Sequence, residues 1–299
     1  MSASADVYMP QAEHPLRMSQ RRIPQLDGLR GIAVLSVVLF HYVLSIPFPS
    51  GGAGARFQDC FRLGVYGVDL FFVLSGFLIG GILLDSRASP RYFRTFYLRR
   101  FHRIFPLYYL WLALYVALGL SAFSHLPPSI RAVWTGWRPT AVYALFLQNL
   151  VRKQLLGISA AWLGPLWSLA VEEQFYLLMP LAVRFLPKRR LAQFLVATIF
   201  LSPLMRAVVS TWAYPRAVRY VATPLRADAL AMGVLLALAL RDQKWQARIA
   251  RNLRWLYATI MLLLSGVIYM SARSALPDNR MEGILIFLMG ALFTAIILL

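Results

Sequence analysis

The sequence predicts an all-α fold, a polytopic bundle of helices that cross a membrane. Of the 299 residues, 59% are hydrophobic and only 14% are charged. Several apolar runs are long enough to cross a bilayer core of about 30 Å, which requires roughly 20 helical residues. The lysines and arginines cluster between these runs, where basic residues set the orientation of membrane helices and meet anionic lipid. The net charge of +19 is therefore explained without nucleic acid as a partner.

Eight spans follow from the apolar runs. The first covers about 31–46 and stops before Pro47, and the second covers 64–84. A basic segment then leads to a third span that begins at Pro106. Residues 1–22 lack the apolar segment of a cleavable signal peptide and are expected to form a cytosolic tail. The remaining spans are predicted at about 166–183, 191–211, 225–240, 255–271 and 281–299.

Whether the stretch 121–165 crosses the membrane is ambiguous from hydropathy, because its one apolar piece, 140–150, is shorter than a spanning helix. If this piece stays outside, the basic clusters at 87–103, 184–190 and 241–254 all lie on the cytosolic side. If it crosses, the last two clusters move to the outside, against the positive-inside bias. We therefore predict an external loop with a re-entrant or interfacial piece.

The first span carries two candidate functional residues, Arg30 and His41. The helical steps between them make about three turns, which puts the two residues about 16 Å apart on nearly the same face. Ionisable side chains inside a bilayer tend to face the bundle interior or a water-filled cavity. An imidazole can take a proton from a hydroxyl near neutral pH, so His41 is a candidate general base. Arg30 can also pair with Asp27, three residues earlier on the helix.

Four motifs occur in order along the chain, and a fifth, weaker one follows. They are Leu-Asp-Gly-Leu-Arg-Gly at 26–31 with His41, Gly-Val-Asp-Leu-Phe-Phe-Val-Leu-Ser-Gly-Phe-Leu at 67–78, Arg-Arg-Phe-His-Arg-Ile-Phe-Pro-Leu-Tyr at 99–108, Leu-Trp-Ser-Leu-Ala-Val-Glu-Glu-Gln-Phe-Tyr at 166–176 and Leu-Arg-Ala-Asp-Ala-Leu-Ala-Met-Gly at 225–233. The ordered set resembles the membrane-bound acyltransferase family 3, whose members O-acylate bacterial surface sugars and other hydroxyl-bearing molecules. The resemblance covers 23–299 and implies a ten-helix bundle in the plasma (inner) membrane, with its last two helices expected beyond residue 299.

The resemblance implies transfer of an acyl group, most often acetyl, from acyl-CoA to a hydroxyl of a cell-surface carbohydrate or glycolipid, such as O-antigen or exopolysaccharide. His41 would then be the base that activates the hydroxyl. Arg30 would hold a phosphate or carbonyl of the acyl donor, for which guanidinium geometry is suited. Three arginines next to the third span become candidates for binding the phosphates of coenzyme A. These are Arg99, Arg100 and Arg103.

Two carboxylates complete the candidate catalytic set, Asp69 in the second span and Glu172 in the fourth. Each could orient His41 or contact the acceptor hydroxyl. The simpler alternatives are that Asp69 pairs with an arginine and that Glu172 is favoured by the helix dipole. Arg226 and Asp228 are expected to form a structural ion pair near a helix end.

The alternative to an enzyme is a membrane transporter or flippase of a polar substrate, without acyl chemistry. Intramembrane histidine, arginine and aspartate would then relay protons or substrate. Transporters often contain inverted repeats, and the two halves of this chain show no convincing repeat. Ser75 lacks the G-x-S-x-G frame of a serine hydrolase. With Cys60 as the single cysteine, the sequence predicts neither a metal site nor a permanently bound cofactor.

The charge distribution also predicts where the candidates lie across the membrane. Arg30 and the arginines at 99–103 fall at the cytosolic ends of their spans. Asp69 and Glu172 fall near the outer side, and His41 lies about midway between the two groups. This layout suits a donor that enters from the cytosol and an acceptor that meets it outside.

Cysteine accessibility tests this sidedness in a Cys60→Ser background. Single cysteines that replace Ser124 and Ser159 should react with an impermeant maleimide from outside intact cells, and one that replaces Ser86 should not. Labelling at position 159 only after permeabilisation would mean that 140–150 crosses the membrane and that every later span is inverted.

Overall fold

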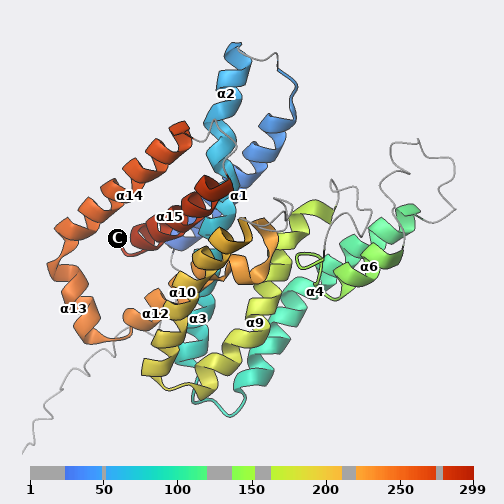
Figure 1. Cartoon of the computed structure of the whole chain (residues 1–299). Coiled ribbons are helices and arrows are strands. Elements are labelled where there is room, and N and C mark those ends of the chain that lie inside the picture. Colours follow the sequence, from blue (N-terminus) through green and yellow to red (C-terminus); the bar gives the residue numbers. More distant parts are fainter. Residues whose placement is uncertain (1–23, 49–51, 120–136, 152–162, 211–219, 274–278) are drawn as a thin grey trace, which may run out of the picture.

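The computed structural model describes residues 24–48, 52–119, 137–151, 163–210, 220–273 and 279–299, and the regular elements within these ranges are all helices (Figure 1). Each of the eight predicted spans overlaps a helix. These helices are α1 (Pro24–Ser45), α3 (Gly67–Asp85), α4 (Tyr92–Gly119), α9 (Trp167–Phe185), α10 (Lys188–Ser210), α12 (Ala227–Ala239), α14 (Leu253–Arg273) and α15 (Asn279–Ile297). Helix α4 begins at Tyr92, well before the predicted start of the third span at Pro106.

Within the described ranges, four helical segments are long and apolar enough to cross a membrane, so the chain is a multi-pass membrane protein. They are Pro24–Ser45, Arg56–Asp85, Lys188–Ser210 and Leu253–Met270. Helix α12 has only 13 residues, and α4 and α9 carry arginines or glutamates in their apolar stretches. Crossing by these helices and by α15 therefore stays a prediction, as does the total of eight spans.

The short helices connect and cover the long ones. They are α2 (Ala53–Phe61), η1 (Arg62–Tyr66), α6 (Trp137–Ala144), η3 (Gly164–Leu166), η4 (Thr223–Leu225) and α13 (Gln243–Arg251). Helix α6 contains eight residues and ends in turns around Phe146, whose backbone is left-handed with φ 54°. The piece 140–150 thus forms no spanning helix, as its length predicts; the parts of the loop at 121–136 and 152–162 lie outside the described residues.

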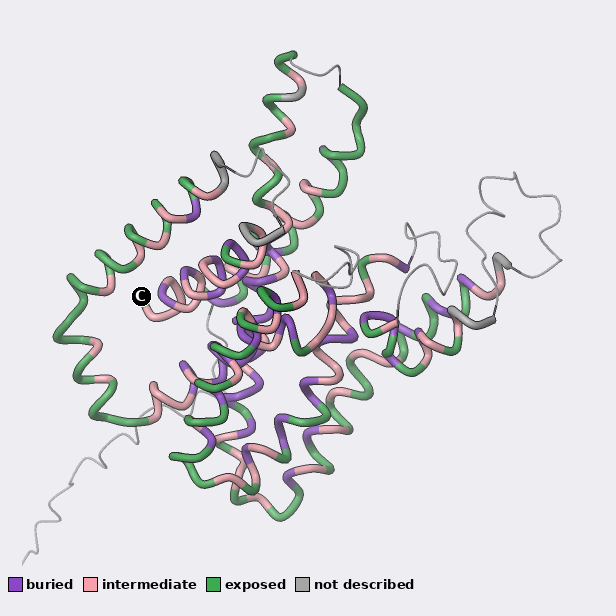
Figure 2. The backbone as a smooth tube through the Cα atoms, in the orientation of Figure 1, coloured by how far each residue is buried: buried purple, intermediate pink, exposed green. Residues whose placement is uncertain are grey.

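Helices α3 and α12 pack directly on each other at the centre of the bundle. Their close approach depends on two glycines, since a Cβ on Gly76 would collide with the carbonyl of Leu230, and one on Gly233 would collide with the carbonyl of Val73. Most residues of both helices are buried. Figure 2 shows this buried core, surrounded by mainly exposed outer helices such as α14.

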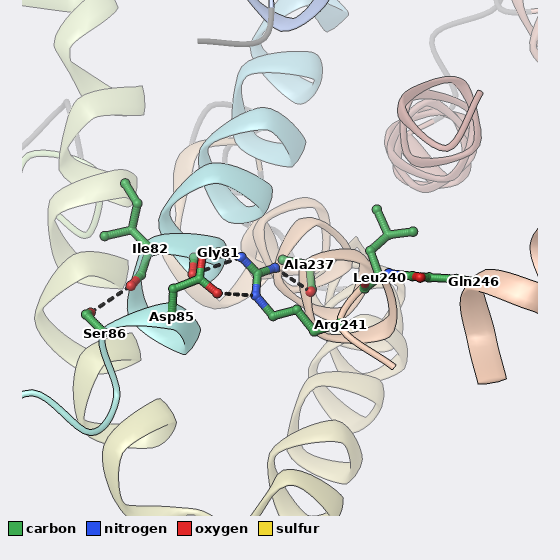
Figure 3. A network of polar contacts seen from close by, with 8 residues as sticks. All are labelled: Gly81, Ile82, Asp85, Ser86, Ala237, Leu240, Arg241 and Gln246. Carbon is green, nitrogen blue, oxygen red and sulfur yellow. Dashed lines mark hydrogen bonds and ion pairs between the residues drawn. The ribbon is translucent and has the colours of Figure 1, made fainter. Parts of the chain in front are cut away.

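The basic segments share one end of the bundle. Arg87 follows α3 and donates to the carbonyl of Leu186, at the end of α9, at 2.8 Å. Arg241 follows α12 and pairs with Asp85, the last residue of α3, at 2.7 and 2.8 Å (Figure 3). Leu26, in the first turn of α1, packs in a cluster with residues from the end of α12. These contacts bring the clusters at 87–103, 184–190 and 241–254 to one side, as the charge distribution predicts.

Substituting Gly233 should test the central helix contact. Gly233→Ala should lower the free energy of unfolding by about 1–3 kcal/mol, because the added methyl overpacks the contact with α3. In the control, Gly266→Ala in α14, the new Cβ lies 3.7 Å from Leu288, an ordinary contact, so helix propensity should make it neutral or stabilising by up to about 1 kcal/mol. Thermal unfolding in one detergent would measure both; equal behaviour of the two variants would contradict the close packing of α3 and α12.

Candidate functional site

A partly exposed carboxylate, Glu172, is held between α9 and α3. Ser75 lies in the middle of α3, and its hydroxyl donates to Oε1 of Glu172 at 2.6 Å. Tyr176 lies one turn further along α9, and its hydroxyl donates to Oε2 at 3.2 Å. Both carboxylate oxygens therefore accept a hydrogen bond, which fixes the orientation of the side chain.

Two arginines from other helices approach this carboxylate. The guanidinium of Arg100, from α4, lies 4.3 Å from the ring centroid of Tyr176. Arg100 also lies within electrostatic range of Glu172 and Glu173, and Arg30, from α1, exerts a weaker electrostatic effect on Glu172. Arg30 remains partly exposed and pairs with Asp27 at 3.5 Å, as its spacing predicts. We call Glu172, Ser75, Tyr176, Arg100 and Arg30 the Glu172 centre.

The Glu172 centre differs from the layout predicted across the membrane. The sequence places Arg30 and the arginines at 99–103 toward one side and Glu172 toward the other. In the structure Arg100 and Arg30 lie within electrostatic range of Glu172, which is nearer than the predicted layout places them.

The three candidate phosphate-binding arginines are not equivalent. Arg99 and Arg103 are exposed, whereas Arg100 is half-buried and faces α9. Helical geometry explains the difference, because consecutive residues point about 100° apart around the axis. Only Arg100 joins the Glu172 centre in the contacts of the described residues.

A second polar centre, around Asp69, is fully buried. Asp69 lies on α3, six residues before Ser75. Asp69 Oδ1 lies 3.0 Å from Nη2 of Arg226, and both side chains are 0% exposed. Three aromatic rings surround the guanidinium, with centroids 4.8 to 5.6 Å from its central carbon. They belong to Phe72, Trp167 and Tyr220. The simpler of the two roles weighed for Asp69, pairing with an arginine, is the one that the contacts support.

The prediction that Arg226 and Asp228 form an ion pair with each other is wrong. Arg226 instead pairs with Asp69, and Asp228 pairs with Arg206 of α10 at 2.6 and 3.1 Å. Arg206 and Asp228 are buried as well. Neighbours two residues apart at a helix start point in different directions. Each therefore finds its partner on a different helix.

Among the described residues, no hydrogen bond or ion pair joins His41 to either centre. Phe40 and Ser36 of α1 lie against Gly64, which precedes α3, so His41 lies in the hairpin formed by α1 and α2. Its side chain is exposed, and its Nδ1 lies 2.8 Å from the carbonyl oxygen of Val37. Arg30 and His41 thus occupy different environments on one helix.

Sequence reasoning missed a polar network that anchors the segment after α6. The amide of Gln174 donates to the carbonyl of Phe146 at 2.6 Å and to Asn149 Oδ1 at 2.8 Å. Asn149 donates to the hydroxyl of Thr223 at 2.7 Å, and Thr223 donates back to Gln174. Three amide-bearing residues in apolar stretches, Gln148, Asn149 and Gln174, were the signal available in the sequence.

The sequence matches the family of acyltransferase domains over residues 23–299, which includes both polar centres and His41. The chain belongs to acyltransferase family 3. The predicted resemblance is therefore confirmed. The match extends over nearly the whole sequence and does not depend on a single motif.

Curated relatives agree with this assignment. The chain is 32% identical over 168 residues to the peptidoglycan O-acetyltransferase OatA of Listeria monocytogenes, which covers 55% of this chain and 24% of that protein. It is 34% identical over 236 residues to YrhL of Bacillus subtilis, and 30% identical over 238 residues to the O-acetyltransferase OatA of Staphylococcus aureus. Each of these two alignments covers 73% of the acyltransferase chain, and they cover 33% and 35% of the relatives' own length. No solved structure matches it.

Removing one partner of the buried pair should destabilise the acyltransferase strongly. Asp69→Asn leaves the charge of Arg226 buried without a counter-charge, which should cost about 3–5 kcal/mol. The control Asp59→Asn breaks a pair with Arg62 in which both side chains are more than half exposed, and it should cost about 0–1 kcal/mol. Thermal unfolding in detergent would compare them, and similar losses would contradict a special role for the buried pair.

Proposed function

We propose that this chain is an integral membrane O-acyltransferase that transfers an acyl group, most often acetyl, from acyl-CoA to a hydroxyl of a cell-envelope carbohydrate. Membership of the family over 23–299 supports the reaction class. The names of the relatives support acetyl as the acyl group and favour the glycan of peptidoglycan as the acceptor over lipopolysaccharide. The transporter alternative gains no support from these relatives.

The observation that carries the proposal is the position of Arg100 over the ring of Tyr176, which donates to Glu172, with Arg30 within electrostatic range of the same carboxylate. Both guanidinium groups are only partly buried, so an anionic ligand can reach them. Guanidinium groups bind phosphate through paired, charge-assisted hydrogen bonds. We assign these two arginines to the phosphates of acyl-CoA. The negative charge of Glu172 attracts both arginines while the donor is absent, and the hydroxyls of Ser75 and Tyr176 hold Glu172. Arg99 and Arg103 contribute positive charge from the exposed face of α4.

His41 is the proposed general base. Helix α1 places it about 16 Å along the axis from Arg30. Acyl-CoA carries its phosphates and its thioester at opposite ends of a long flexible arm, so one donor can contact Arg30 and present its acyl group near His41. The exposed imidazole takes the proton of the acceptor hydroxyl, and the oxygen attacks the thioester carbonyl. The C–S bond breaks, the imidazolium returns the proton to the sulfur, and coenzyme A leaves as the thiol. Asp69 supports this arrangement from the core and does not touch the reacting atoms.

Purified protein in lipid nanodiscs, incubated with labelled acetyl-CoA and soluble peptidoglycan fragments, tests the proposal. Label should move to the glycan in step with loss of the thioester. His41→Gln should lower transfer by at least about 100-fold, the scale of general base catalysis, with acetyl-CoA binding unchanged. Arg100→Gln should weaken acetyl-CoA binding by about ten-fold or more, since bonds to charged groups contribute about 1.5–3 kcal/mol.

Arg94→Gln is the matched control, because Arg94 is exposed on the same helix, away from Glu172. Arg87 is unsuitable as a control, since it bonds to the end of α9. Equal losses of acetyl-CoA binding in the Arg94 and Arg100 variants would mean that the arginines attract acetyl-CoA only through their general positive charge. Full transfer by the His41→Gln variant would remove His41 from the mechanism, and wild-type protein that binds acetyl-CoA without transferring label would refute the acyltransferase activity itself.

A further inference from the structure

The short helix α13 (Gln243–Arg251) separates its charged and apolar residues around its axis. Successive residues turn by about 100°, so Lys244, Arg248 and Arg251 fall within about 60° of one another. Trp245 and Ile249 fall within about 40° of each other on the adjacent side. The helix contains no acidic residue, and Asp242 before it caps its first turn by accepting from the backbone of Lys244 at 2.9 Å.

None of the residues of α13 is buried against the rest of the protein. Trp245 is 47% exposed, although the guanidinium of Arg248 lies 4.9 Å from its ring centroid. The pattern continues into α14, where Arg254 lies 5.7 Å from the ring centroid of Trp255, which is 62% exposed. Large aromatic side chains exposed beside basic ones are typical of the boundary between lipid and water.

The connections of α13 hold it at that boundary. Helix α14 follows after Asn252 and contains the candidate span Leu253–Met270, of which only 6% is buried inside the protein. The residues immediately before a spanning helix must lie at the membrane surface. Figure 3 shows that Gln246 donates back to the carbonyl of Leu240, at 2.5 Å, and that Arg241 is fixed to Asp85 of α3. The helix is thus attached to the core at its start and to a membrane span at its end.

We propose that α13 is an interfacial helix that binds anionic phospholipid headgroups through Lys244, Arg248 and Arg251, while Trp245 and Ile249 lie at the level of the upper acyl chains. The basic sector complements the negative charge of the headgroups. A helix with one basic and one apolar face lies in the plane of the membrane surface. Helix α13 contains neither His41 nor any residue of the Glu172 centre, so the inference is independent of the proposed catalytic activity.

Full-length protein with a single reactive cysteine tests this local lipid preference. In a Cys60→Ser background, Ala247→Cys on the exposed surface of α13 carries a fluorophore. The protein is placed in vesicles of phosphatidylcholine, and quenching is compared for phosphatidylglycerol and phosphatidylcholine that carry the same nitroxide on the same acyl carbon. Quenching by phosphatidylglycerol should be at least about five-fold more efficient, the factor expected from one basic side chain near an anionic surface. The preference should decrease in high salt, which screens exposed charges.

The decisive comparison uses two triple variants with the same change of net charge. Lys244→Gln/Arg248→Gln/Arg251→Gln should bring the quenching ratio close to one. Lys188→Gln/Arg189→Gln/Arg190→Gln removes three exposed charges at the start of α10 and should leave the ratio near the wild-type value. Equal quenching by the two lipids in the wild-type background would overturn the proposal without any variant. An equal decrease of the quenching ratio in the two triple variants would also overturn it, because the whole basic end of the bundle would then attract anionic lipid without a specific role for α13.

Discussion

The buried ion pair between Asp69 and Arg226 is the interaction on which the rest of the bundle depends. Removing two charges from water is expensive, and removing one partner of a buried pair leaves the other charge uncompensated, which costs about 3–5 kcal/mol. Here the oppositely charged atoms lie 3.0 Å apart, and three aromatic faces surround the guanidinium. Their quadrupoles attract the cation, which partly replaces its lost hydration. A packing of α3 against α12 that separates Asp69 from Arg226 would leave each charge without its partner.

The glycines of α3 and α12 make this pairing possible. Gly76 and Gly233 let the two backbones approach so closely that neither helix has room for a Cβ at the crossing point. The same approach places the start of α12 against the first turns of α3, where Asp69 lies. A second buried pair, Arg206 with Asp228, joins α10 to the same region. Charge pairing therefore specifies which helices are neighbours, and the glycines specify how near they come.

This core holds the Glu172 centre in place without being part of it. Ser75 lies six residues after Asp69, about 9 Å along α3, and presents its hydroxyl to Glu172 on α9. Because α3 is fixed by α12 on one side, Ser75 is a stable reference point for the carboxylate. Arg100 and Arg30 come from α4 and α1, helices with more exposed faces. In the Glu172 centre, α3 is the packed helix that positions the carboxylate, and Arg30 and Arg100 are partly exposed arginines that a ligand can reach.

The sequence by itself determined the membrane class, the approximate place of the helices that the apolar runs form, the family, and pairs close in the chain such as Asp27 with Arg30. These properties depend on apolar length, charge bias and motif order, which are local. The sequence did not determine the start of α4, which lies in the basic segment before Pro106. Only the tertiary structure decided that Arg226 pairs with Asp69, that Asp228 pairs with Arg206, that Arg100 alone of its cluster faces Glu172, and that His41 lies in the α1–α2 hairpin. Those outcomes depend on helix rotation and crossing, and a side chain's partner on another helix changes with every 100° step around the axis, which no pattern along one helix specifies.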